Sequence, residues 1–442
     1  MDFAGLLSTI NGFVWGPIML TLLVGTGVYL TLRCGFVQFV QLPKALKLVF
    51  SRPKEEGAGD ITPFQALTTA LSATIGTGNI AGVATAIFLG GPGAIFWMWI
   101  CAVFGMATKY GEAVLAVKYR HVLPDGSMQG GPMRYIADGL GWKWLGALFA
   151  FCGAIAAFGI GSMVQSNSVA LALKTSWGVP SIATGLVLAL LTGVVIIGGI
   201  KRIGKVTEKL VPAMALFYVV GALVIIVINI DKLPEAFGLI FAHAFAPSSA
   251  AGGFAGATVS AAMRFGVARG VFSNESGLGS APIAHAAAKT NNPVHQGLVA
   301  MTGVFFDTII VCTMTALVIL MTGAWTSGET SSALTQLAFN NGLPGPGGLI
   351  VTVGLAVFAY STMIGWAYYG EECIEYLFGL KARMPYRYIF CLVIFLGAFQ
   401  KVGLVWDFSD TMNGAMAIPN LIGLIGLSGV LAKATREGLS KV

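Results

Sequence analysis

Eleven long runs of mostly apolar residues follow one another along the chain, and this repetition limits the folds that it can adopt. About 20 apolar residues in a helix are enough to span the hydrocarbon core of a bilayer. Only 10% of the residues are charged, against about 25% in soluble proteins. The sequence therefore predicts an all-α polytopic membrane protein. The expected spans are 13–32, 62–89, 93–117, 145–173, 181–199, 207–229, 253–288, 297–323, 347–369, 386–404 and 412–432.

Lysine and arginine are unevenly distributed between these runs. Of the 26 such residues, 21 fall on one side of the expected membrane, among them Arg52, Lys54 and Lys109, whereas Arg264 and Arg269 lie inside the seventh span. Because positive loops stay in the cytoplasm, this bias predicts an extracellular N-terminus and a cytoplasmic C-terminus. The net charge of +7 is therefore explained by topology, and it forms no dense basic tract that would suit nucleic acid.

Three loops contain candidate short helices. Residues 231–247 are amphipathic and expected outside, residues 332–339 are similar, and the glycine-rich loop 126–141 favours a short helix bounded by glycines. The six cysteines form no C-x-x-C pair, so we expect packing residues rather than disulfides or metal ligands. No cofactor is expected.

The second span contains a stretch that is unsuited to an unbroken helix. Residues 72–82 read S-A-T-I-G-T-G-N-I-A-G, with three glycines, two threonines and an asparagine. Glycine weakens a helix interior, and threonine and asparagine compete for backbone partners. In hydrocarbon a freed backbone group must be satisfied by protein, ligand or ion. The stretch therefore predicts a helix break at which something binds.

A weak internal repeat relates this stretch to the seventh span. A shift of 197 residues aligns residues 75–87 with residues 272–284, so that Gly82 meets Gly279 and Asn79 meets Ser276. Spans two to six and spans seven to eleven form two groups of five, which start on opposite sides of the membrane. Two broken helices in inverted halves are typical of secondary transporters with a site at mid-membrane.

Broken helices expose groups of both polarities. The free N–H groups of a helix start suit a carboxylate, and the free carbonyls of a helix end suit a hard cation such as Na+. Side-chain groups that could join them belong to Thr74, Thr77, Asn79 and Ser273. In the ninth span, Ser361 and Thr362 either join such a site or bond carbonyls of their own helix.

Other intramembrane residues leave alternatives open. Gln165 could donate to a substrate carboxylate or bond between helices. Phe272 and Trp366 are either core residues or walls over a small ligand.

Two carboxylates inside spans are rarer and more informative. Glu275 lies at the second break, where a structural pair with Arg269 or Arg264 is favoured over a proton-coupling role. Asp307 is either an ion ligand or the partner of an arginine.

The sequence offers no ATP-driven or enzymatic mechanism. It lacks a G-x-x-x-x-G-K-[ST] motif, a catalytic triad and a metal-ligand motif. We therefore expect a non-enzymatic transporter driven by an ion gradient. The alternatives are coupling to protons rather than Na+, and a channel or a substrate-sensing receptor.

Four blocks of the chain carry a resemblance to a known family. These are residues 90–105 (G-G-P-G-A-I-F-W-M-W-I-C-A-V-F-G), 73–82, 130–136 (G-G-P-M-R-Y-I) and 273–285 (S-N-E-S-G-L-G-S-A-P-I-A-H). Together they resemble the sodium:alanine symporters, the alanine/glycine:cation symporter family, over nearly the whole chain.

The resemblance implies the leucine-transporter fold and Na+-coupled uptake of alanine or glycine across the plasma membrane. It implies an extra N-terminal span with its loop (1–60), a first five-helix repeat (61–230), an extracellular loop (231–252), a second repeat (253–432) and a cytoplasmic tail (433–442). The partners are then small amino acids, Na+ and the lipid bilayer.

The resemblance also implies roles for single residues. Thr74 and Gly78 would contact the amino acid, and Thr74 and Asn79 would lie near one Na+. The carbonyls of Ser72 and Ile75, together with Ser361 and Thr362, would form a second Na+ site. Phe272 and Ser273 would line the pocket from the second broken helix.

Overall fold

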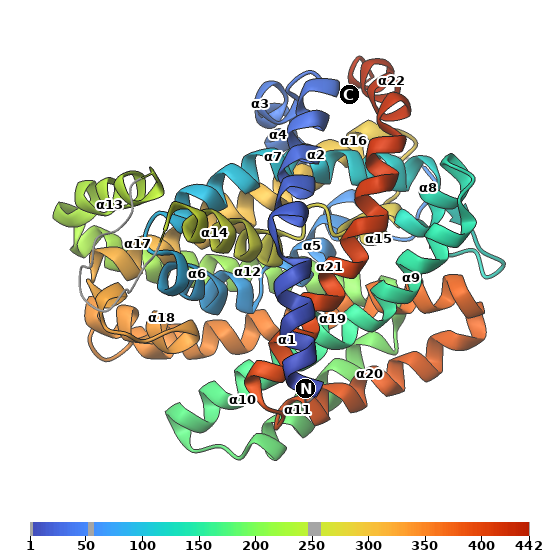
Figure 1. Cartoon of the computed structure of the whole chain (residues 1–442). Helices are drawn as coiled ribbons and strands as arrows, with labels where there is room; N and C mark the ends of the chain where they lie inside the picture. Colours follow the sequence, from blue (N-terminus) through green and yellow to red (C-terminus); the bar gives the residue numbers. More distant parts are fainter. Residues whose placement is uncertain (1–2, 52–56, 246–257, 442) are drawn as a thin grey trace.

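The computed structural model describes residues 3–51, 57–245 and 258–441, and in these ranges it is a helical bundle with one two-stranded hairpin (Figure 1). The α-helices are α1 (Phe3–Val14), α2 (Pro17–Arg33), α3 (Val37–Val40), α4 (Leu42–Ser51), α5 (Pro63–Thr74), α6 (Val83–Gly90), α7 (Ala94–Lys118), α8 (Pro132–Gly139), α9 (Lys143–Phe158), α10 (Val164–Trp177), α11 (Ser181–Ile196), α12 (Gly199–Ile228), α13 (Leu233–Phe245), α14 (Val259–Asn274), α15 (Ala281–Ala286), α16 (Pro293–Val304), α17 (Thr313–Met321), α18 (Ser331–Gly342), α19 (Gly347–Phe378), α20 (Arg383–Gly397), α21 (Val402–Gly426) and α22 (Ser428–Leu439).

Shorter elements join or interrupt these helices. Three are π-helical, namely η1 (Gly78–Gly82), η2 (Gly159–Met163) and η4 (Phe305–Cys312). Three are 3-10 turns, namely η3 (Ile230–Lys232), η5 (Ala324–Thr326) and η6 (Leu380–Ala382). Strands β1 (His121–Val122) and β2 (Met128–Gln129) pair antiparallel, with His121 opposite Gln129.

Several apolar helices are long enough to cross a membrane. In the described ranges five helical stretches qualify alone, and three bent pairs raise the number to as many as eight. The five are Ala94–Lys118, Lys143–Trp177, Gly199–Ile228, Pro293–Met321 and Gly347–Phe378. The prediction of a helical chain with several apolar helices is thus confirmed, whereas the count of eleven spans and the inverted repeat stay predictions. Arg52, Lys54 and residues 246–257, with the expected start of the seventh span, lie outside the described residues.

The second span is broken where its glycines predict. Pro63 opens α5, and Thr62 caps it by accepting the Gln65 N–H in a capping box. The helix ends at Thr74, and Ile75 is extended, with φ −75° and ψ 93°. The two halves, Pro63–Thr74 and Gly78–Gly90, are bent by 51°.

The expected seventh span is also broken, between α14 and α15. Glu275 follows Asn274 in the left-handed conformation with φ 58°, and Gly277 and Gly279 have φ 87° and 82°. This backbone suits glycine, because side chains with a Cβ are strained there. The segment 275–280 therefore crosses the interior without regular helix.

The two breaks lie against one another in the middle of the bundle. A Cβ added at Gly78 would lie 3.0 Å from the Ser273 Cα, so a larger residue would require the two segments to move apart by a few tenths of an ångström. The far ends of the same spans also meet, because Ile61 and Ala288 form a parallel bridge. The two broken segments thus contact each other at the break and again at their far ends.

The expected short helices form as predicted. Helix α13 covers residues 233–245 of the amphipathic segment, and its Phe237 and Phe241 lie beside Trp99. Helix α18 and helix α8 occupy the other two candidate regions. The β1–β2 hairpin before α8 was not expected.

Candidate functional site

Asp307 joins the two broken spans. Its carboxylate accepts hydrogen bonds from Asn79 Nδ2 at 2.7 Å, from Ser273 Oγ at 3.0 Å and from Thr308 Oγ1 at 2.7 Å. Asp307, Asn79 and Ser273 are each fully buried. These hydrogen-bond partners are neutral, so a hard cation is the natural counter-charge for this buried carboxylate.

Asn79 makes hydrogen bonds within the first break in addition to its bond to Asp307. Its Oδ1 accepts the Gly76 N–H at 2.9 Å, and its backbone carbonyl accepts the Thr315 hydroxyl at 2.8 Å. Thr308 and Thr315 had no role in the sequence interpretation. Thr308 lies in η4 and Thr315 in the first turn of α17, and hydroxyl groups inside an apolar run were the available signal for them.

A second group of oxygens lies against α19. The Ser361 hydroxyl lies 3.2 Å from the Ser72 carbonyl and 3.5 Å from that of Ile75, and Thr362 Oγ1 lies 3.5 Å from the Ile75 carbonyl. The structure therefore brings together all four residues that the resemblance groups as a Na+ site. Both hydroxyls also donate to Phe358 O in their own helix, at 2.8 and 3.0 Å, and a role of this pair in an ion site stays a prediction.

The remaining residues predicted at the first break differ in their surroundings. The Thr74 hydroxyl donates to the Ala70 and Leu71 carbonyls of its own helix, at 3.3 Å each. The Thr77 hydroxyl is buried and makes no hydrogen bond to described residues. Gln165 Oε1 accepts the Thr77 N–H at 3.5 Å, so Gln165 bonds between helices at the edge of the break.

The expected pair of Glu275 with Arg269 or Arg264 is wrong. Arg269 instead pairs with Asp410 on α21, with Nη2 2.5 Å from Oδ2. Positions six residues apart on a helix point about 240° apart, so Arg269 faces away from the break. Glu275 accepts the Trp366 indole N–H at 2.6 Å and the Ser280 hydroxyl at 2.6 Å. Trp366 is thereby fully buried between α19 and the second break.

Phe272 lies beside the Arg269–Asp410 ion pair. Its ring stacks on that of Trp406 with 5.0 Å between centroids, and the Arg269 guanidinium lies 5.4 Å from both rings. Phe272 is 4% exposed and lies beside Gly78. Phe272 and Trp406 therefore form a layer between the polar centre and the Arg269–Asp410 pair.

Lys109 and Glu112 are functional candidates that the sequence reasoning missed. Lys109 was counted among the cytoplasmic charges, but in the structure it lies in α7 and its side chain is buried in the protein interior. Glu112 Oε1 accepts the N–H groups of Gly277 and Gly279 at 3.1 Å each and Asn420 Nδ2 at 2.7 Å. Glu112 thus supplies acceptors to the irregular backbone of the second break. Charged side chains are rare inside apolar runs, and this rarity was the signal that could have identified Lys109 and Glu112 as candidates.

Arg120 ties the far ends of both broken spans together. Its guanidinium donates to four backbone carbonyls, those of Ala58 at 2.7 Å, Ala286 at 2.8 Å, Ala288 at 2.6 Å and Thr290 at 2.7 Å. Burial lowers the pKa of Arg120 from its usual high value, and the nearby Asp60 carboxylate opposes that shift. An arginine keeps its charge under such a shift, so the contacts are charge-assisted.

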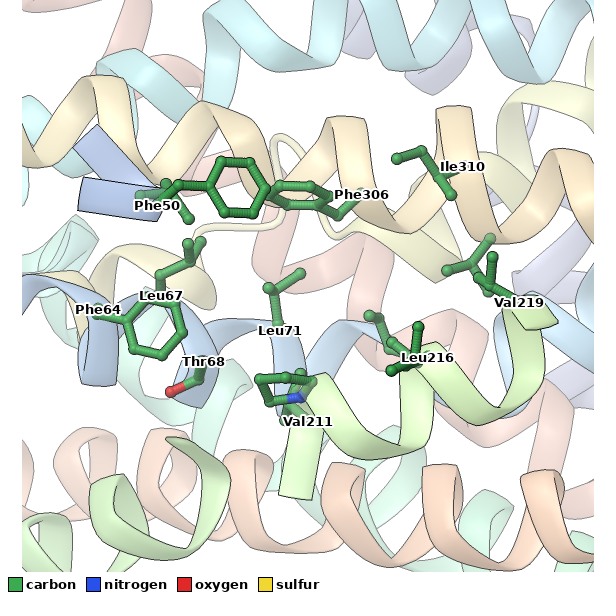
Figure 2. Close-up of a pocket in the computed structure, with 15 residues that line it drawn as sticks. Phe50, Phe64, Leu67, Thr68, Leu71, Val211, Leu216, Val219, Phe306 and Ile310 are labelled. Atoms are coloured by element: carbon green, nitrogen blue, oxygen red, sulfur yellow. The ribbon is translucent and has the colours of Figure 1, made fainter. Parts of the chain in front are cut away.

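An apolar cavity of about 390 Å³ lies outside this polar centre, between α4, α5, α12 and η4 (Figure 2). Its lining includes Phe50, Phe64, Leu216 and Phe306, and Thr68 is its one hydroxyl-bearing lining residue. Burying charged groups there would leave them without partners. The cavity is therefore unsuited to a zwitterionic ligand.

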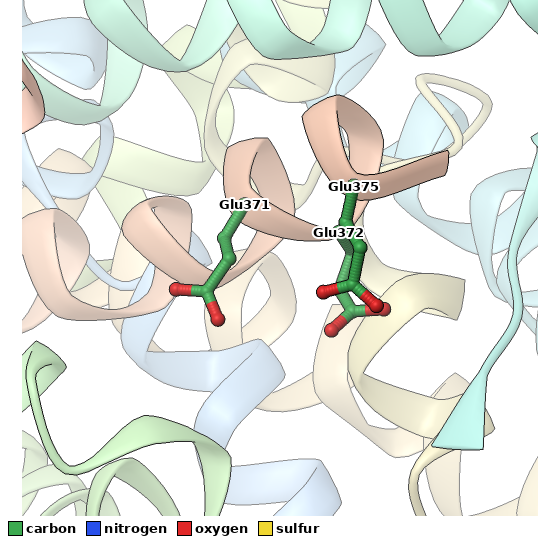
Figure 3. Close-up of side chains that lie close together, drawn as sticks. All are labelled: Glu371, Glu372 and Glu375. Carbon is green, nitrogen blue, oxygen red and sulfur yellow. The ribbon is translucent and has the colours of Figure 1, made fainter. Parts of the chain in front are cut away.

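Three carboxylates gather at the end of α19, from Glu371, Glu372 and Glu375 (Figure 3). Arg387 holds both oxygens of Glu371 at 2.6 Å, and Arg383 lies 2.7 Å from Glu375 Oε2. These ion pairs join the end of α19 to the start of α20.

A helical membrane bundle whose two broken spans meet at buried carboxylate and hydroxyl groups defines a secondary transporter. The comparisons with known proteins agree. The model of the sodium:alanine symporter family matches residues 2–441, and the chain belongs to this family. The protein is accordingly a multi-pass membrane transporter and not an enzyme.

Two relatives and one solved structure illustrate the likeness. The chain is 58% identical to the sodium/alanine symporter AgcS of Methanococcus maripaludis, over 99% of this chain and 97% of the relative. It is 39% identical to the probable sodium/glutamine symporter GlnT of Bacillus subtilis, over 97% and 89%. The crystal structure of MhsT in complex with L-phenylalanine covers 86% of this chain and all of MhsT, with 13% identity and a TM-score of 0.51. MhsT is a transporter of the leucine-transporter fold, so this match shows the fold alone.

Proposed function

We propose that the protein imports alanine, glycine or both together with Na+ across the plasma membrane, by alternating access. The observation that carries the proposal is the contact of Asp307 with Asn79 and Ser273, which joins both helix breaks through one buried carboxylate. The names of the family and of the 58% identical relative support Na+ and alanine as substrates. Glycine is included as a substrate because the sequence resembles the alanine/glycine:cation symporter family.

Two Na+ positions are proposed. Asp307, Asn79 and Ser273 would hold one ion by their oxygens, and the Ser72 and Ile75 carbonyls with Ser361 and Thr362 would hold the other. Thr74 retains its proposed role near Asn79, although its hydroxyl bonds its own helix. Unwound carbonyls and hydroxyls are the usual Na+ ligands of broken spans.

The amino acid would bind between the two breaks. The N–H groups at the start of η1, around Gly78, would meet its carboxylate, and Gln165, which accepts the Thr77 N–H, would orient the break. Phe272 and Trp366 would limit the size of the side chain. Na+ binding orders both breaks and so prepares the N–H groups for the substrate, which makes the two affinities reciprocal.

The proposed topology has eleven spans in two inverted repeats after an extra N-terminal span, with the N-terminus outside and the C-terminus in the cytoplasm. The unequal distribution of lysine and arginine supports the orientation.

Uptake of labelled alanine into proteoliposomes tests the proposal, with Na+ and pH gradients imposed separately. We expect a Na+ gradient alone to concentrate alanine, and excess unlabelled glycine to compete. Accumulation with a pH gradient alone would favour proton coupling through the buried carboxylates. Flux without accumulation would indicate a channel, and binding without flux a receptor.

A further inference from the structure

Lys109 lies on the face of α7 that packs on the second break. Gly105, Lys109 and Glu112 are spaced by four and three residues, so they share one side of the helix. A Cβ added at Gly105 would lie 2.7 Å from Ser276 Oγ, and Glu112 accepts the Gly277 N–H. The side chain between these two contacts therefore faces the irregular segment 275–280.

The ammonium group of Lys109 is buried without a hydrogen-bond partner among the described residues. The side chain is 2% exposed, and Nζ, Glu112 Oε2 and Ser276 Oγ are all buried atoms without a partner there. Burying a charge is costly unless opposite charges lie nearby, and an orphaned buried group in a native structure requires an explanation. Packing alone gives no reason for a lysine at this position.

The charge of Lys109 acts on three carboxylates from different parts of the fold. These are the carboxylates of Glu275 after α14, of Glu112 on α7 and of Asp307 in η4. Glu275 and Glu112 hold the second break, whereas Asp307 lies at the centre of the proposed first Na+ position. Lys109 is thus close enough to both to link them electrostatically.

We propose that the Lys109 ammonium is a fixed counter-charge of the second helix break and that it sets the Na+ affinity of the Asp307 site. This inference rests on the proposed function, because it requires Na+ to bind at Asp307. A positive charge beside the site opposes a second cation, and Glu275 offsets that charge. Lys109 is accordingly a positioning residue, which acts on the ion through the field at Asp307 and not by contact.

The charge role and a merely structural role predict opposite signs for Na+ affinity. If Lys109 only supports the break, its loss disorders the site and weakens Na+ binding. If its charge opposes the ion, Lys109→Met tightens Na+ binding, and Glu275→Gln weakens it. The double variant keeps the net charge and returns the affinity toward that of the wild type.

Equilibrium binding of ²²Na+ to the purified full-length protein, without amino acid and at constant ionic strength, measures these affinities. We expect a change of about tenfold for each single variant, which is the size of an interaction between partly screened charges at an effective dielectric constant of about 20. Lys118→Met is the matched control, because it makes the same change at an exposed position of α7. We expect no shift there.

Unchanged or weaker Na+ binding by folded Lys109→Met overturns the inference. If that variant does not fold, Glu275→Gln decides, since unchanged or tighter binding by it overturns the inference equally. Absence of Na+ binding by the wild-type protein instead rejects the proposed function itself. The two failures are therefore distinguishable.

Discussion

Replacement of Arg120 by alanine should open the end of the bundle where the two broken spans meet. The guanidinium makes four hydrogen bonds to backbone carbonyls, and each bond to a charged donor contributes about 1.5–3 kcal/mol net. Water replaces part of these contacts because Arg120 is half-buried, so we take about 3 kcal/mol for the loss rather than the full sum. That corresponds to a roughly 100-fold larger population of the opened end.

Amide hydrogen exchange measured by mass spectrometry reports this population directly. The amides to follow are those of Asp60 and Ile61, which donate to Ala287 O at 2.8 and 3.2 Å, and that of Lys289, which donates to Ile61 O at 2.7 Å. We expect them to exchange about 100-fold faster in Arg120→Ala, while amides in the middle of α7 keep their rates.

Two further variants test the reasoning. Arg120→Lys keeps the charge but loses the planar fork of donors, so it should give an intermediate rate. Arg436→Ala is the control, because Arg436 bonds a carbonyl of its own helix, Ala432 O at 3.4 Å. Equal exchange rates in wild type and Arg120→Ala would refute the argument that these contacts hold the end closed.

Three other substitutions test the polar centre and its outer layer. Asn79→Ala removes a donor to Asp307 and should raise the Na+ concentration for half-maximal alanine uptake at least about tenfold; unchanged uptake rejects a role for Asn79. Trp366→Ala should admit larger amino acids as competitors of alanine, and unaltered selectivity removes Trp366 from the pocket wall. Arg269→Ala should speed hydrogen exchange near the start of α21, and Asp410→Ala should add little to it in the double variant; additive effects would contradict direct pairing.

The sequence predicted the membrane bundle and the positions of both breaks from local chemistry. Runs of apolar residues define spans because length and composition decide whether a helix crosses a bilayer. The glycines around Gly78 and Gly277 weaken any helix that contains them. The positions of both breaks could therefore be predicted without knowing which helices pack against them. The short helices α13, α18 and α8 followed from spacing and glycine boundaries in the same way.

The partners of the charged residues depended on the tertiary structure. Sequence proximity suggested Arg269 for Glu275, but the rotation of α14 sends Arg269 to Asp410, more than 100 residues away. Asp307 could be an ion ligand or an arginine partner until the fold placed it against Asn79 and Ser273.

Lys109 is another charged residue whose surroundings could not be predicted from the sequence. Its position near the end of an apolar run suggested a topogenic charge, whereas the packing of α7 on the second break buries it. Hydropathy and glycine content are properties of a local segment, so the sequence alone determined where helices form and where they break. Charge pairing depends on which helix faces meet, and only the tertiary structure brings those faces together.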